Sequence, residues 1–181
     1  YSDVIDELVD AGYMDADRQY RLHGFKTATG KIEFDSVELR EQGYDGLPMY
    51  KEPVESPVSS PDVFADYPLV LTSGGRQKYF THSQQHNIAK LLDFDPKPRI
   101  QIHPEDAAVR GIQHDEKVEV TTLRGTVQFY ADVTDIMKLG VVHCFHGWNE
   151  ANVNDLTDDS CLDPISGFPA FKSLLCEVNS L

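Results

Sequence analysis

The segment with the most chemical potential is residues 72–87, with sequence TSGGRQKYFTHSQQHN, which combines two glycines, two cations and many side-chain donors. Glycine lets a ligand approach the backbone, and an arginine can bind a phosphate with two donors. An apolar run precedes the segment and helical signals follow it, an order that suits a phosphate group. Neither the Walker loop nor the GxGxxG fingerprint is present. A long polar surface loop is the alternative interpretation.

A second polar segment, residues 143–149, has the sequence HCFHGWN. His143 and His146 are three residues apart, and a strand places such residues on opposite faces, so the spacing does not favour a metal pair. Trp148 is the only tryptophan and follows a glycine at the expected strand end. We expect its indole to pack under a loop or against a flat ring system.

A third segment, residues 152–172, carries asparagine, threonine and lysine in a turn-rich stretch between two expected strands. Such side chains can satisfy the amide edges of a heterocycle and a phosphate. A plain connection between strands is the alternative.

No self-contained active site is evident. The GxSxG nucleophile elbow is absent, and no serine or cysteine stands beside a histidine in a known catalytic pattern. The three cysteines, Cys144, Cys161 and Cys176, have no CxxC spacing, so neither a disulfide framework nor a cysteine-rich metal site is expected.

Composition narrows the class of protein. The 181 residues carry a net charge of −14, which argues against nucleic-acid binding and against a helix lying on anionic lipid. No apolar run is long enough to insert into a membrane. The chain does not begin with methionine and shows no signal peptide, so we expect a piece of a longer polypeptide that is cytoplasmic or exported with its parent.

Two regions are expected. Residues 1–66 hold 15 acidic and 6 basic side chains, and their proline-rich end, residues 47–66, predicts an extended arm or linker. Short helices are predicted near residues 3–11 and 36–43, and a hairpin-like segment at residues 25–34. Residues 67–181 predict a small β-barrel with long loops, with a helix at 103–111 and strands at 67–72, 100–102, 117–123, 126–133, 140–145 and 174–178.

Five motifs then occur in a specific order: YPLVLTSGGR at 67–76, HSQQHN at 82–87, IHPEDAA at 102–108, NDLTD at 154–158 and DPISGFPAFK at 163–172. Together they resemble the C-terminal domain of the molybdopterin-dinucleotide oxidoreductases, the dimethyl-sulfoxide-reductase family. The resemblance covers residues 67–181, and residues 25–34 and 43–50 look like the stretch leading into that domain. The sequences of the second and fourth motifs are similar to those of the branch that contains thiosulfate and polysulfide reductases and acetylene hydratase.

The resemblance implies a mainly β fold, a six-stranded double-psi β-barrel with short helices and long loops. It implies that the domain binds molybdopterin guanine dinucleotide, carrying molybdenum or tungsten, for an oxidoreductase of anaerobic respiration. The domain would be inactive alone, because the protein ligand of the metal, and any iron–sulfur cluster, belong to other parts of the parent chain. Its partners would be those other domains and an iron–sulfur electron-transfer subunit.

The resemblance also implies cofactor-binding residues from three places along the chain. They are Thr72, Gly74, Arg76, His82 and Ser83 in the first loop, His146, Gly147 and Trp148 in the second segment, and Asn154, Phe171 and Lys172 in the third. One departure concerns the first loop, where two glycines precede the arginine and many relatives have one.

Two other classes of function are compatible with a small β-barrel. A stand-alone double-psi barrel could serve as a protein-interaction or substrate-recognition module, as in the N-domains of AAA-type unfoldases. A self-contained hydrolase or decarboxylase on a similar barrel lacks a nucleophile in a recognisable setting.

Overall fold

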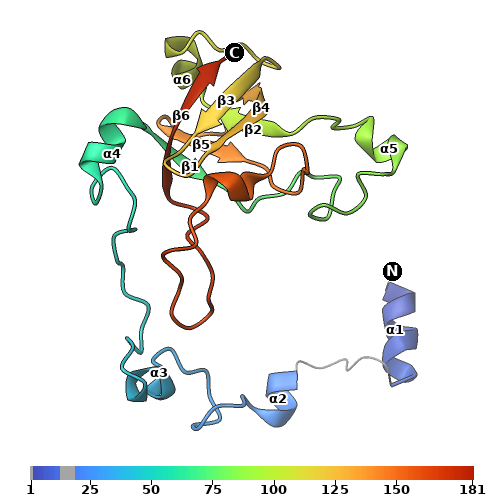
Figure 1. The fold of residues 1–181 in the computed structure, drawn as a ribbon. Coiled ribbons are helices and arrows are strands. Elements are labelled where there is room, and N and C mark those ends of the chain that lie inside the picture. Colours follow the sequence, from blue (N-terminus) through green and yellow to red (C-terminus); the bar gives the residue numbers. More distant parts are fainter. Residues whose placement is uncertain (1, 13–18) are drawn as a thin grey trace. The chain divides into compact units, whose positions relative to one another are not determined.

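The computed structural model describes residues 2–12 and 19–181, so residue 1 and residues 13–18 of the predicted arm lie outside the description. The chain divides into two compact units, residues 1–51 and residues 52–181. All the strands that the structure describes belong to the second unit (Figure 1).

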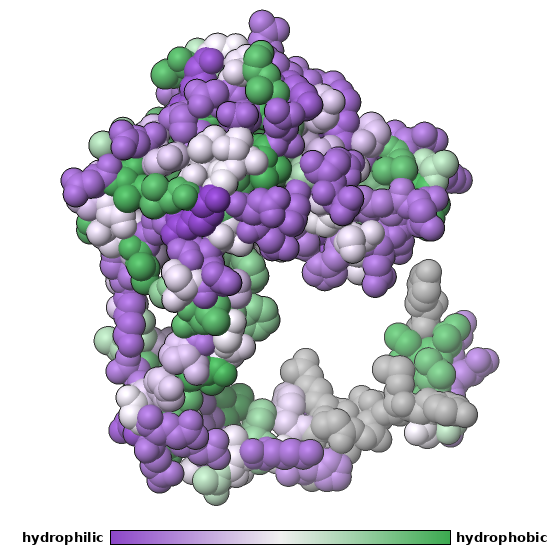
Figure 2. Space-filling view, in the orientation of Figure 1, coloured by the Kyte–Doolittle hydropathy of each residue, from purple (hydrophilic) through white to green (hydrophobic). Residues whose placement is uncertain are grey.

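The first unit contains three short helices: α1 (Ser2–Asp10), α2 (Gln19–His23) and α3 (Val37–Glu41). The helices predicted near residues 3–11 and 36–43 are confirmed, and Ser36 caps α3 by accepting a hydrogen bond from the Leu39 N–H at 3.2 Å. Residues 25–34 form a turn without paired strands, so the hairpin-like prediction there is wrong. None of the unit's described side chains is buried, and the apolar side chains of α1 lie at the surface (Figure 2).

The second unit is a closed barrel of six strands in the order β1-β5-β2-β4-β3-β6, which confirms the predicted mainly β double-psi barrel. The pairs β1–β5 and β2–β4 are parallel and the other four are antiparallel. The strands are β1 (Leu69–Thr72), β2 (Arg99–Ile102), β3 (Lys117–Thr121), β4 (Thr126–Val133), β5 (Val141–Cys144) and β6 (Leu174–Ser180).

The barrel closes around the apolar positions that alternate along its strands. On β4, Val127, Phe129 and Ala131 are buried, and on β3 Val118 and Val120 are buried, as the alternation predicts. The turn between these two strands contains residues 124 and 125, and the strands pair from Lys117 opposite Tyr130 to Thr121 opposite Thr126. These side chains form one contiguous core that supports the loops above it.

Short helices decorate the barrel: α4 (Pro61–Asp66), α5 (Ala89–Leu92), α6 (Pro104–Val109) and a 3₁₀ turn, η1 (Val153–Leu156). The helix predicted at residues 103–111 is confirmed, with the His103 side chain accepting from the Glu105 N–H at 3.2 Å. The prediction that residues 47–66 are extended throughout is wrong at its end, where α4 forms. Pro61 occupies the first helical position, where its fixed φ favours a helix start and no N–H is needed.

The segment before α4 is fastened to the barrel by Glu55, which is buried. Its carboxylate accepts from the Leu175 N–H at 2.6 Å and pairs with Arg124, which also pairs with Asp158. The Ser173 hydroxyl donates to the Glu55 carbonyl at 2.8 Å. Glu55 therefore connects the incoming chain to the start of β6 and, through Arg124, to the long loop before it.

No helix in the described part of the chain has the length and apolar character that a membrane span requires.

Candidate functional site

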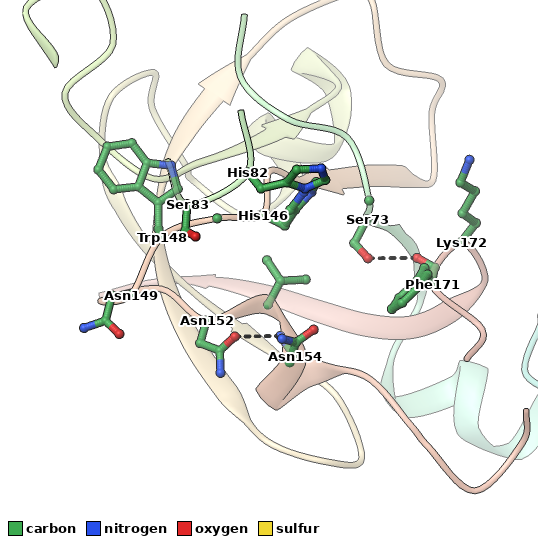
Figure 3. Close-up of a pocket in the computed structure, with 13 residues that line it drawn as sticks. Ser73, His82, Ser83, His146, Trp148, Asn149, Asn152, Asn154, Phe171 and Lys172 are labelled. Atoms are coloured by element: carbon green, nitrogen blue, oxygen red, sulfur yellow. Dashed lines mark hydrogen bonds between the residues drawn. The ribbon is translucent and has the colours of Figure 1, made fainter. Parts of the chain in front are cut away.

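A pocket of about 680 Å³ opens where the loops after β1 and β5 meet the loop before β6 (Figure 3). The three polar segments singled out in the sequence all reach it. Its lining residues are Ser73, Gly74, His82, Ser83, His146, Gly147, Trp148, Asn149, Asn152, Val153, Asn154, Phe171 and Lys172.

The first loop is tied to the loop before β6 at the point where β1 ends. The Ser73 N–H and the Ser73 hydroxyl both donate to the Phe171 carbonyl, at 2.9 and 3.0 Å. Gly74 follows with φ of +85°, a conformation that glycine adopts without strain. This junction places Phe171 and Lys172 beside the first loop, although about a hundred residues of chain separate them.

The first loop also lies directly against the loop after β5, and Gly147 makes this possible. A Cβ on Gly147 would stand 2.6 Å from the His82 carbonyl carbon and 3.1 Å from the Ser83 nitrogen. The backbone at Gly147 has φ of +106°, which also favours glycine. Only a residue without a side chain lets the two loops approach this closely.

A chain of hydrogen bonds crosses this contact and fixes two imidazole tautomers. His146 Nδ1 lies 2.7 Å from the Gly75 carbonyl, which only accepts, so Nδ1 carries the proton. Nε2 of His146 then accepts from His82 Nδ1, at 2.6 Å. The remaining nitrogen of His82, Nε2, accepts from Arg76 Nη1 at 3.4 Å.

His143 supports the site from behind. Its Nδ1 donates to the Thr72 hydroxyl at 2.8 Å, because the one proton of that hydroxyl is donated to the Val142 carbonyl at 3.2 Å. The ring occupies the space that a side chain on Gly75 would need. Burial is the main cause that lowers the pKa of His143, and the nearby His146 and Lys172 side chains act in the same direction.

Trp148 forms one wall of the pocket and is buried. Its indole packs edge-on against Phe80 and His86, with ring centroids 5.7 and 4.4 Å away. Below it, η1 presents Asn154, and the Asn152 side chain caps η1 by accepting from the Asn154 N–H at 3.2 Å (Figure 3).

The electrostatics of the pocket contrast with those of the chain. The chain has 30 acidic residues and a net charge of −14, yet none of the residues that line the pocket is acidic. Lys172, two imidazoles and several hydroxyl and amide side chains surround the space instead. The ammonium, hydroxyl and amide groups of this set fit an anion attached to a polar heterocycle, and the volume is that of a ligand site.

Nine of the eleven residues expected to bind cofactor line the pocket. Thr72 and Arg76 do not, because Thr72 turns to Val142 and His143 and Arg76 contacts the outer nitrogen of His82. Four lining residues were not expected: Ser73, Asn149, Asn152 and Val153. Each lies within one of the three polar segments, but only the three-dimensional packing of these segments shows that they line the pocket.

The imidazoles of His143 and His146 hydrogen-bond to different partners. Among the residues that the structure describes, no group of three or more His, Cys, Asp or Glu side chains could hold a metal ion.

Comparison with known proteins identifies the family. Residues 69–175 match the family model described as "Molydopterin dinucleotide binding domain". The chain belongs to this family. The match confirms the function expected from the motifs, binding of a molybdopterin dinucleotide as in the molybdenum and tungsten enzymes of the dimethyl-sulfoxide-reductase family. It supports molybdopterin guanine dinucleotide as the cofactor and does not favour a stand-alone interaction module.

Individual relatives agree with this membership. Acetylene hydratase from Syntrophotalea acetylenica is 31% identical across 82% of this chain and 23% of its own length. Dopamine dehydroxylase from Eggerthella lenta is 31% identical across 80% of this chain and 16% of its own length. The structure of acetylene hydratase from Pelobacter acetylenicus superposes with a TM-score of 0.78 at 27% identity, covering 88% of this chain and 24% of that one. The chain thus spans less than a quarter of the length of these relatives.

Proposed function

We propose that this chain is the cofactor-binding part of a molybdenum- or tungsten-dependent oxidoreductase, with residues 67–181 as the binding domain and residues 1–66 as the arm leading into it. The observation that carries the proposal is the acid-free pocket in a strongly acidic chain. The length of the relatives supports further domains that complete the active site. An iron–sulfur electron-transfer subunit is the partner we propose for the assembled enzyme.

Within the pocket, we assign the phosphate end of the dinucleotide to the side chains of Lys172 and Ser83. Ser73 and His82 lie beside them, but their own donors are used by Phe171 and His146. Lysine is a point donor for a phosphate, and the Ser83 hydroxyl can add a hydrogen bond. Arg76 contacts His82 and does not line the pocket. The positive charge of Lys172 would not be cancelled locally, because no carboxylate lines the space.

The asparagines and Trp148 suit the flat, polar rings of the cofactor. Asn149, Asn152 and Asn154 offer both donors and acceptors at one side of the pocket, and the indole offers an apolar surface. When bound, the cofactor supplies the metal-centred chemistry. The residues of this chain bind it, orient it and shield it from water on one side.

The proposal is tested by titrating the isotope-labelled chain with GDP and, separately, with guanosine, while amide resonances are followed by NMR. We expect GDP to shift the amides of the pocket loops, around residues 73–83, 146–154 and 171–172, and guanosine to shift them far less. Equal effects of both ligands, or shifts spread over the barrel away from the pocket, would remove the assignment of a phosphate site.

A further inference from the structure

Gln77 is a buried polar residue that does not itself line the pocket. Its side chain is 3% exposed, although it lies in the loop after β1 that supplies Ser73 to Ser83. A buried primary amide is costly unless its donors and acceptor are satisfied. The partners that satisfy it connect three segments that are distant in sequence.

The orientation of the amide is fixed by those partners. Trp148 Nε1, which can only donate, bonds to Gln77 Oε1. Gln77 Nε2 donates to Asp95 Oδ2 at 2.6 Å and to the Lys97 carbonyl at 2.9 Å, and both of these groups accept. No alternative placement of the amide oxygen and nitrogen satisfies all three contacts.

The far side of this network is anchored in the barrel. Asp95 accepts at its other oxygen from Arg99 Nε at 3.0 Å, and Arg99 is the first residue of β2. The Phe145 N–H donates to the Arg99 carbonyl at 3.2 Å, just before the loop that carries Trp148. Gln77 therefore joins the wall of the pocket to the frame of the barrel.

We propose that Gln77 is a positioning residue for the cofactor pocket: it holds the indole of Trp148 in the wall and thereby fixes the shape of the space offered to a flat ring system. The identity of the ligand in this proposal rests on the proposed function. The position of the indole does not, because it follows from the hydrogen bonds alone. Phe80 and His86 touch the other edges of the ring, and neither provides the hydrogen bond that sets its orientation.

Trp148 is the only tryptophan in the chain, so its fluorescence reports on this one side chain. We expect Gln77→Met, which keeps the volume and removes the hydrogen bonds, to shift the emission to longer wavelength and to increase quenching by acrylamide about two- to fivefold. We expect the same variant to weaken GDP binding about five- to tenfold, the effect of losing one well-placed hydrogen bond. Gln113→Met, at an exposed glutamine outside the pocket lining, is the matched control and should match wild type in every readout.

Gln77→Glu tests the hydrogen-bonding role of Gln77 through the pH dependence of the Trp148 emission. A protonated glutamic acid can accept from Trp148 and donate to Asp95. A carboxylate could still accept from Trp148, but it cannot donate and its charge is repelled by the carboxylate of Asp95, so we expect the side chain to move away from the indole. We expect wild-type emission and quenching at low pH, and values like those of Gln77→Met at high pH. This variant also decides the matter if Gln77→Met does not fold.

Unchanged emission and quenching in folded Gln77→Met, or a Gln77→Glu variant whose emission does not change with pH, would overturn the positioning role. If wild-type protein fails to bind GDP while the fluorescence changes occur, the proposed function fails and the positioning of Trp148 stands.

Discussion

Replacing Gly147 with alanine tests the contact between the two pocket loops. The new Cβ would lie 2.6 Å from the His82 carbonyl carbon, so the loops must separate until that distance exceeds 3.0 Å. Overpacking of this kind costs about 1–3 kcal/mol. The backbone conformation, with φ of +106°, adds about 1–2 kcal/mol for any residue with a Cβ. We therefore expect Gly147→Ala to lower the free energy of unfolding by about 2–5 kcal/mol.

Gly140→Ala is the matched control, because Gly140 has φ of +78° but open space where a Cβ would be. It should lose only the backbone contribution of about 1–2 kcal/mol. Urea unfolding followed by far-ultraviolet circular dichroism measures both variants without relying on the neighbouring tryptophan. The difference between them isolates the steric contact. Equal losses in the two variants would refute the close approach of the loops at Gly147.

Three further outcomes follow from the contacts of the barrel. Arg124→Met removes the cation paired with the buried carboxylate of Glu55 and should lower the free energy of unfolding by about 3 kcal/mol in urea. This is the lower end for a buried pair, because the Arg124 side chain is 23% exposed. A loss below about 1 kcal/mol would contradict the pairing. Hydrogen bonds from Ser160 and Arg124 lower the pKa of Asp158. The stability that Asp158 contributes is therefore present above its ordinary pKa of 3.8 and is lost as the pH falls below it. In Arg124→Met, the free energy of unfolding should depend less on pH over this range. Of the three thiols, Cys161 alone should react with Ellman's reagent in the native protein, since burial raises the pKa of the other two, and two or more fast thiols would refute their burial.

Much of the barrel could be predicted because its strands obey simple alternation. Val127, Phe129 and Ala131 recur at every second position of β4, and this period specifies both the strand and its inward face. The start of α6 is also predicted from the sequence, because proline stands at its first position and two acidic residues follow it. The helix α4 is not predicted because four prolines between residues 48 and 61 favour extended chain, although proline is also favoured at a helix start, where Pro61 lies.

The site was predictable in its segments but not in its contacts. The sequence marks His82 and His146 as polar loop residues, yet nothing local indicates that rings 64 residues apart share a hydrogen bond. Strand order determines that meeting, because β1 and β5 are neighbours in parallel and both loops leave the same end of the barrel. The same holds for Gln77, whose role depends on Asp95 in the loop before β2 and Trp148 in the loop after β5.

Charge reversal at Lys172 tests the central claim most directly. The protein that carries this chain would be produced with Lys172→Glu and, as a control of equal charge change, with Lys138→Glu at an exposed position outside the pocket lining. Molybdenum, tungsten and the GMP released by acid hydrolysis would be measured per polypeptide. We expect at least about a tenfold loss of cofactor in Lys172→Glu, since a charged hydrogen bond contributes about 1.5–3 kcal/mol, and wild-type content in Lys138→Glu. Full cofactor content in folded Lys172→Glu would contradict the account.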